Sequence, residues 1–411
     1  MPVLEATDVH QFHVALLVLG GLLVLGALAS GLAGRSFVSL AALYVLAGFV
    51  LGHGALDVLD FNARSGFVAD LATVALIVIL FRDGLEVDAE MLQSHWHLPF
   101  RKLVLAMPLT VAIVSLATRL LTDLSWAECL LVGSLLAPTD PVLSSSVVTN
   151  PRVPSIIRHS LNLESGLNDG LALPAVLAFS AALASGSGHF VWWRFVLEDI
   201  SIGLATGLVV ALVAASLMPR ETSFDAAIPP HQKSLYALGV AVAAYGLAVL
   251  PPHGNGLIAV YVAAITFGIR RPDIRGAFEA QAEDLVEIAK LGIFVVFGSL
   301  LTFHGLFGDG WSAVAIAAIT FLVARPVAVF AALLGTATDT ATRGFMAWFG
   351  PKGVATMTFS LLVLSDQITA GPRIFNLAAL VVFCSVLVHG ATDTAGAEWI
   401  ARRATLPPRA Q

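Results

Sequence analysis

Residues 164–170 read ESGLNDG and bring two carboxylates, an amide and a hydroxyl together inside a strongly apolar stretch. On a helix, Ser165 and Asp169 lie one turn apart on the same face, so a hydroxyl and a carboxylate point in the same direction. Hard oxygen ligands of this kind suit a small alkali cation. Burial favours the protonated form of a carboxylate, whereas a bound cation favours the ionised form. The stretch therefore predicts a site at which a cation and a proton compete for Asp169.

The second carboxylate of this stretch, Glu164, lies about 140° around the helix from Asp169 and needs a different partner. A buried carboxylate is stable only with a counter-charge at similar depth. Arg325 is the best candidate in the sequence and Lys352 the second, so we expect a Glu164–Arg325 ion pair that acts as a structural clamp. Asn168 is neutral, which leaves Asp169 as the one titrating group and predicts electroneutral exchange of one cation for one proton.

Two further segments combine helix-breaking residues with a charge. Pro138 and Pro141 bracket Thr139 and Asp140, and proline inside a helix removes a backbone hydrogen bond. In a membrane, the freed backbone groups must be buried in protein or line a wet cavity. We expect an interrupted helix here, in which the carbonyl group of Thr139 can face a bound cation.

The matching segment is FGPKG, residues 349–353, in which glycine and proline surround Lys352. Two interrupted helices that meet near the middle of the membrane would bring partly charged helix ends together. Asp140 near the N-terminal ends and Lys352 near the C-terminal ends would offset these dipoles.

The elements that must position these residues are transmembrane helices. The 411-residue chain is 57% hydrophobic and 12% charged, with a mean hydropathy of +0.87, whereas soluble domains carry about 25% charged residues. Apolar runs long enough to cross a bilayer recur along the chain and predict an all-α polytopic membrane protein with about thirteen spans. These spans are 12–33, 37–53, 66–81, 99–120, 126–149, 159–184, 190–218, 232–250, 255–269, 284–303, 311–334, 343–365 and 373–393.

The distribution of Lys and Arg predicts the orientation in the membrane. With the N-terminus outside, inner loops and the C-terminal tail hold 15 of the 22 basic residues, Lys102 among them, and the outer side holds 4. We expect a plasma or inner membrane protein with its C-terminus in the cytoplasm and no cytoplasmic regulatory domain after residue 393. Nothing in the sequence indicates nucleic-acid binding, a cofactor or a metal other than the transported alkali cation.

A weak internal repeat appears at a spacing of seven spans. The fifth span (LLAPTDPVLSSSVV) and the twelfth (WFGPKGVATMTFS) share a central proline, small residues and a charge. An odd helix between two six-helix halves would give the halves opposite orientations, as in inverted-repeat transporters. We therefore expect two inverted six-helix repeats with the fifth and twelfth helices interrupted.

The combination of APTDPV and ESGLNDG resembles the paired signature of the monovalent cation:proton antiporters of the sodium/proton exchanger type, along essentially the whole chain. The Asn-Asp form of the second motif is similar to that of the electroneutral branch. The resemblance implies a homodimer in the lipid bilayer, and a core, about 66–184 and 284–393, with the two interrupted helices crossed. It also implies a dimerisation scaffold, about 12–53 and 190–269, and an elevator-like motion of the core.

Carried over by motif, the resemblance makes Asp169 the ion- and proton-binding carboxylate and Asn168 its structural neighbour. Ser165 and the backbone around Thr139 and Asp140 are the implied co-ligands of the cation. Glu164, Arg325 and Lys352 are implied to stabilise the interrupted helices and their charges.

Two positions depart from the family pattern. Many relatives end the third span with Phe-Glu-Gly-Gly-Leu, whereas this chain has FRDGL, with Arg82 in place of the glutamate and Asp83 beside it. Relatives of this branch often carry Arg where this chain has Lys352. Both departures leave open the choice among Na⁺, which we favour, K⁺ and Li⁺.

Three other functions compete with this interpretation. An intramembrane aspartyl protease would use Asp140 and Asp169 as its dyad, but Thr-Asp-Pro and Asn-Asp-Gly do not match the motifs of that class. A cation symporter or uniporter could use the same inverted-repeat fold. An electrogenic antiporter would need a second titrating group, and Glu164 would then have to be free of Arg325.

Overall fold

The computed structural model describes residues 17–28, 40–62, 66–87, 96–140, 147, 150–184, 191–219, 228–251, 253–366 and 368–404. Within these residues the chain forms helices and no strands, as the sequence predicts. Five helices are long and apolar enough to cross a membrane: His97–Leu121, Ser155–Ala184, Trp192–Leu217, Trp311–Ala332 and Gly371–Arg403. The thirteen crossings and the inverted repeat stay predictions.

The helices follow one another along the chain in three stretches. The first half contains a helix at Leu17–Leu28, α2 (Leu40–Leu51), α3 (Gly66–Leu85), α5 (His97–Arg101), η1 (Lys102–Ala106), α6 (Met107–Leu121), α7 (Trp126–Leu136) and α9 (Ser155–Ala184). The middle contains α10 (Trp192–Arg194), η3 (Phe195–Ile200), α11 (Ser201–Leu217), α12 (Pro230–Val249) and α13 (Gly256–Arg270). The last part contains α14 (Pro272–Ser299), α15 (Phe303–Leu306), α16 (Trp311–Ile319), η4 (Thr320–Ala324), α17 (Arg325–Ala332), α18 (Thr340–Trp348), α19 (Val354–Ser365) and α20 (Gly371–Ala404).

Two helices extend further than the apolar runs indicate. α14 begins at Pro272 rather than at residue 284, and α20 continues to Ala404 rather than to residue 393. The added turns carry ion pairs at helical spacing, Arg275 with Glu279 and Arg402 with Glu398. Such pairs support a helix in water, so a search for apolar residues misses these segments.

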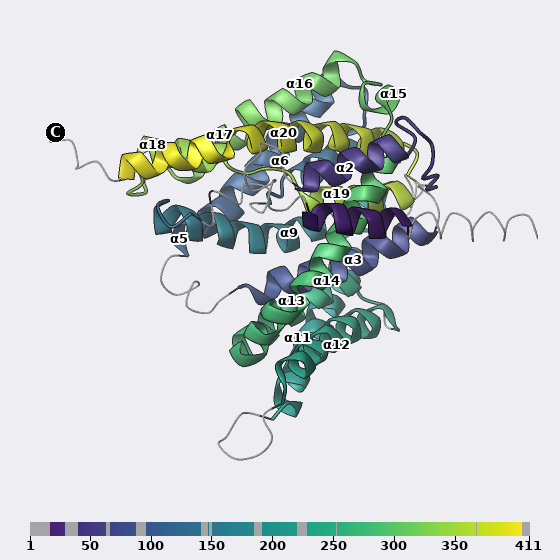
Figure 1. Ribbon diagram of the computed structural model, residues 1–411, viewed down its shortest axis with the longest axis vertical. Helices are drawn as coiled ribbons and strands as arrows, with labels where there is room; N and C mark the ends of the chain where they lie inside the picture. The colour runs from purple at the N-terminus through teal and green to yellow at the C-terminus, as the bar shows by residue number, and fades with distance from the viewer. Residues whose placement is uncertain are drawn as a thin grey trace, which may run out of the picture.

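The helices fall into groups that Figure 1 displays along the long axis of the molecule. α11, α12 and α13 pack against one another at one end, and α3 and α14 lie next to them. α6, α16, α17 and α20 lie toward the other end. α9 runs between these groups and contacts α3, α7, α13 and η1, so the helix that carries ESGLNDG connects the two ends of the molecule.

Glycine permits the close contact between α2 and α14. A Cβ atom added at Gly48 would lie 2.3 Å from the carbonyl oxygen of Val295, and one added at Gly298 would lie 2.2 Å from that of Val45. Small residues allow membrane helices to approach backbone to backbone. Any larger residue at either position would push the two helices apart.

The helix interruption predicted for the twelfth span is present. α18 ends at Trp348, α19 begins at Val354, and residues 349–353 between them are not helical. In the fifth span, α7 ends at Leu136 and residues 137–140 are also not helical. Pro141 and the rest of that span up to residue 146 lie outside the described residues.

Candidate functional site

Asp140 lies at the N-terminal end of α19, where the two interrupted segments meet. Its backbone N–H donates to the carbonyl oxygen of Pro351 at 2.8 Å. Its Oδ2 accepts a hydrogen bond from the N–H of Val354 at 3.3 Å. The N-terminus of a helix carries partial positive charge, which a carboxylate stabilises. Gly353 makes room for it, because a Cβ there would lie 2.4 Å from Asp140 Oδ2.

Lys352 binds the opposite kind of helix end. Its Nζ donates to the carbonyl oxygens of Ala137 at 3.2 Å and Pro138 at 3.0 Å, just beyond the C-terminus of α7. These carbonyls carry the partial negative charge of the helix end, and Lys352 is only 1% exposed. The arrangement of Asp140 and Lys352 therefore matches the one expected from the charges and the breaks.

Asn168 connects α9 to the first interruption. Its Nδ2 donates to both oxygens of Thr139, at 2.8 Å to the backbone carbonyl and at 2.9 Å to Oγ1. A carbonyl oxygen has two lone pairs, so the Thr139 carbonyl keeps one acceptor position after binding Asn168. The contact holds the interrupted backbone beside the turn of α9 that carries Asp169.

Asp169 has no comparable partner in the part of the chain that the structure describes. The residue is 6% exposed and its Oδ1 is buried without a hydrogen-bond partner. The charges that act on its carboxylate are those of Asp83, Asp140, Lys352 and Arg82. A buried carboxylate without a bonded counter-ion is costly, which sets Asp169 apart from the other carboxylate of α9.

Ser165 lies one turn before Asp169 on α9, as the sequence predicts, and is only partly buried. Oxygen atoms of the types that alkali cations use thus come from α9 and from the interruption at Thr139.

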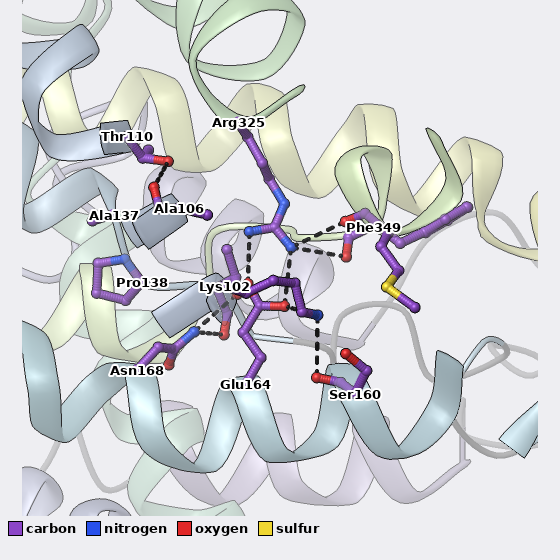
Figure 2. A network of polar contacts seen from close by, with 12 residues as sticks. Lys102, Ala106, Thr110, Ala137, Pro138, Ser160, Glu164, Asn168, Arg325 and Phe349 are labelled. Atoms are coloured by element: carbon purple, nitrogen blue, oxygen red, sulfur yellow. Dashed lines mark hydrogen bonds and ion pairs between the residues drawn. The ribbon is translucent and has the colours of Figure 1, made fainter. Parts of the chain in front are cut away.

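Glu164 is bound by two cations. Arg325 Nη1 contacts Glu164 Oε1 at 3.0 Å, and Lys102 Nζ contacts Glu164 Oε2 at 2.6 Å. Figure 2 shows both side chains converging on Glu164, which points away from α9. Arg325 also donates to the carbonyl oxygens of Met346 and Phe349, each at 3.3 Å, around the end of α18. The expected Glu164–Arg325 pair is therefore present, within a larger cluster.

One expectation about the cations near Glu164 is wrong. The distribution of basic residues places Lys102 in an inner loop, but Lys102 begins the π-helical segment η1 and its side chain is 0% exposed. Lys352 is the second candidate partner of Glu164 in the sequence, and its ammonium group contacts carbonyls of the first interruption. Lys102 lies within the apolar run 99–120, and this depth is the signal that could have identified it.

Tyr261 of α13 is a residue of the site that the sequence does not reveal. Its hydroxyl donates to the carbonyl oxygen of Gly166 at 2.8 Å. A Cβ added at Gly170 would lie 2.0 Å from Cε1 of the Tyr261 ring. The small pair Gly166 and Gly170 therefore admits this ring beside Asp169, and the sequence signals the close approach but not the residue that makes it.

Arg82, at the position where the family resemblance leads us to expect a glutamate, is held by acidic neighbours. It forms ion pairs with Asp83 at 3.0 Å and with Glu86 at 2.7 Å. Arg82 and Glu86 line a cavity of about 200 Å³ between the end of α3 and α14. Glu86 lies beyond α3, and loss of hydration, reinforced by Asp83, raises its pKa to about 7 despite the attraction of Arg82. Among the described residues, no group of three or more His, Cys, Asp or Glu side chains forms a metal site.

The chain is similar to known proteins along most of its length. The family described as sodium/hydrogen exchanger, transmembrane, matches residues 20–396. The K(+)/H(+) antiporter NhaP of Alkalimonas amylolytica is 23% identical over 396 residues, which is 95% of this chain and 67% of that protein. NhaP2 of Shewanella baltica, also named a K(+)/H(+) antiporter, is 24% identical over 99% of this chain and 69% of its own length.

Solved structures show the same fold. The sodium proton antiporter MjNhaP1 of Methanocaldococcus jannaschii at pH 8 superimposes with a TM-score of 0.79 and 19% sequence identity. The match covers 95% of this chain and 99% of MjNhaP1.

Proposed function

This chain belongs to the sodium/hydrogen exchanger family, and on that premise we propose that it exchanges a monovalent cation for a proton at Asp169. The observation that carries the proposal is the state of this carboxylate. It is buried, and in the described part of the chain its Oδ1 has no hydrogen-bond partner. A proton and a cation are the two species that satisfy such a group, and they exclude each other.

The cation ligands are drawn from α9 and from the first interruption. Asp169 supplies a carboxylate oxygen, Ser165 a hydroxyl, and Thr139 the remaining lone pair of its carbonyl group. Asn168 positions Thr139, and Asp140 adds negative charge nearby. Na⁺ is the favoured cation and K⁺ the alternative, because one carboxylate with neutral oxygens serves either ion.

The exchange is electroneutral in this proposal. Glu164 is the other buried carboxylate of α9, and Arg325 and Lys102 bind its two oxygens at 3.0 and 2.6 Å. A carboxylate that is held by two fixed cations keeps its charge through the cycle. Only Asp169 then changes partners, and one cation leaves as one proton binds.

Alternating access follows the elevator mode that the family resemblance implies. The core with α9, α19 and the interruptions moves against a scaffold that contains α11, α12 and α13 and forms a homodimer. The grouping of α11–α13 at one end of the molecule supports this division (Figure 1). In the cell membrane the N-terminus lies outside and the C-terminus in the cytoplasm.

The test uses purified protein in liposomes with a preset pH gradient. NaCl and KCl are added separately, with and without a clamped membrane potential, and choline chloride serves as the control salt. We expect one or both alkali cations to dissipate the gradient at a rate that does not depend on the potential. A rate that follows the potential would indicate an electrogenic antiporter, and no response to either cation would contradict exchange.

A further inference from the structure

Lys102 occupies a position between two oxygen acceptors on α9. Its Nζ lies 2.6 Å from Glu164 Oε2 and 3.2 Å from the carbonyl oxygen of Ser160. The side chain is 0% exposed, so water does not compete for these contacts. A carboxylate and a backbone carbonyl are also the ligand types that hard metal cations use.

Glu164 does not require Lys102 for charge balance. One arginine neutralises one carboxylate, and Arg325 Nη1 already binds Glu164 Oε1 at 3.0 Å. Arg325 Nη2 lies 3.5 Å from Oε2, whereas strong hydrogen bonds between charged groups are about 2.7–2.9 Å long. Lys102 is therefore the main donor to Glu164 Oε2. Without its ammonium group, this oxygen and the Ser160 carbonyl oxygen would face each other with no donor between them.

We propose that the Lys102 ammonium group fills a second monovalent cation site, formed by Glu164 Oε2 and the Ser160 carbonyl oxygen. The side chain acts as a cation tethered to η1 and keeps this site closed to mobile ions. Lys102 thereby restricts exchange to Asp169. This consequence for the stoichiometry rests on the proposed function, whereas the site itself rests on the contacts alone.

Ser160 offers a further oxygen ligand through its side chain. Its hydroxyl is buried without a hydrogen-bond partner in the described part of the chain. The same residue lines a cavity of about 360 Å³ between α5, the start of α9 and residues 336–338. A mobile cation that replaces the ammonium group would thus find a third oxygen on Ser160, a residue that also lines this cavity.

Lys102 and Arg325 each lie at one end of a π-helical segment. η1 begins at Lys102, and a second π segment, η4, ends directly before Arg325. π segments widen a helix locally and recur at functional sites. η1 contacts both α9 and α17, so the two cations approach Glu164 from neighbouring helices.

The first test measures cation binding through stability. Thermal unfolding of Lys102→Ala is followed in increasing NaCl, KCl or methylammonium chloride, with choline chloride at equal ionic strength as the reference. Because a ligand that binds only the folded state raises the unfolding temperature, we expect a rise of about 3 °C at a hundred times the dissociation constant. Lys102→Arg keeps a tethered cation and should gain nothing beyond the wild type. Glu164→Gln in the Lys102→Ala background should remove the gain.

Transport supplies the second readout. Lys102→Ala should make exchange respond to the membrane potential, and the added Glu164→Gln change should remove that response. If Lys102→Ala is too unstable, Lys102→Met in the same salts keeps the bulk of the side chain. The proposal would be overturned if the Lys102 variants fold but none of these cations raises their unfolding temperature beyond that in choline chloride. It would also be overturned if the variants are unstable and no cation raises their unfolding temperature. A wild type that exchanges nothing would refute the proposed function alone, since the stability test needs no transport.

Discussion

Glu164 and Asp169 lie five residues apart on α9, and each is 6% exposed. Glu164 is bound by Lys102 and Arg325, whereas no described residue forms an ion pair with Asp169. Burial is the same, so burial does not decide what each carboxylate does. The two carboxylates differ in the number of fixed cations around them: Glu164 is held by two, whereas Asp169 has none among the described residues and is the group that, in the proposed function, takes a mobile ion.

Removing the charge of Asp169 should have the largest effect. Asp169→Asn keeps the size of the side chain and loses the group that titrates, so we expect exchange in liposomes to fall to the level of protein-free vesicles. The protein should stay folded, because no ion pair is broken. Gel filtration and thermal unfolding check the fold, and exchange at the normal rate in this variant would refute the role of Asp169.

Removing the charge of Glu164 should act on stability instead. Glu164→Gln leaves Lys102 and Arg325 buried without a counter-charge, and breaking a buried pair from one side costs about 3–5 kcal/mol. We expect a large drop in the unfolding temperature.

The matched control for this change is Glu198→Gln. Glu198 pairs with Arg194 at 2.8 Å, but both side chains are largely exposed, at 47% and 65%. Such a pair contributes less than about 1 kcal/mol. If both variants lost the same stability, the cations around Glu164 would not be what fixes it.

Glu164 and Asp169 also show how much of the site could be predicted from the sequence. The prolines and glycines around Thr139 and Lys352 predict breaks, because their backbone effects are local. The need of Glu164 for a counter-charge predicts Arg325, since few basic residues lie inside apolar runs. The resemblance to the family signature predicts that the exchange chemistry lies at Asp169, and this assignment stays a prediction.

Contacts between segments that are far apart in the sequence could not be predicted in this way. Lys102 is 62 positions from Glu164, and beside Arg101 at the edge of a span it has the appearance of an inner-loop residue. Tyr261 is 95 positions from Gly166, and a glycine pair indicates space without naming what fills it. Both contacts depend on how helices pack, which hydropathy does not encode.

A change in the packing beside Asp169 should have a smaller effect than the removal of either charge. Charges fix Glu164, whereas the Tyr261 ring fixes the turn after Asp169 by contact with Gly170. Gly170→Ala would place a methyl group 2.0 Å from that ring, and overpacking of this kind costs about 1–3 kcal/mol. We expect a lower unfolding temperature together with slower exchange.

A second change separates the ring from its hydroxyl. Gly170→Ala should lose less stability in a Tyr261→Ala background than in the wild type, because the ring that the new methyl group meets is gone. In a Tyr261→Phe background, which keeps the ring and loses only the hydrogen bond to Gly166, Gly170→Ala should lose as much as in the wild type. An equal reduction in both backgrounds would mean that the phenol hydroxyl, and not the ring, limits the space at Gly170.

Glu86 is intermediate between Glu164 and Asp169, because it has one fixed cation and acidic neighbours. Arg82 binds it at 2.7 Å, yet loss of hydration, reinforced by Asp83 and Glu279, raises its pKa to about 7. The folded state then holds a proton that the unfolded state has lost from about pH 4.5 upward, so this group lowers stability as the pH rises from about 4.5 to about 7. Glu86→Gln should remove that decline, by less than about 1 kcal/mol because the side chain is 37% exposed. Unfolding temperatures of both proteins between pH 4.5 and 8 measure it. Parallel curves would mean that a single arginine is enough to keep a carboxylate ionised here, as the role proposed for Lys102 assumes for Arg325 and Glu164.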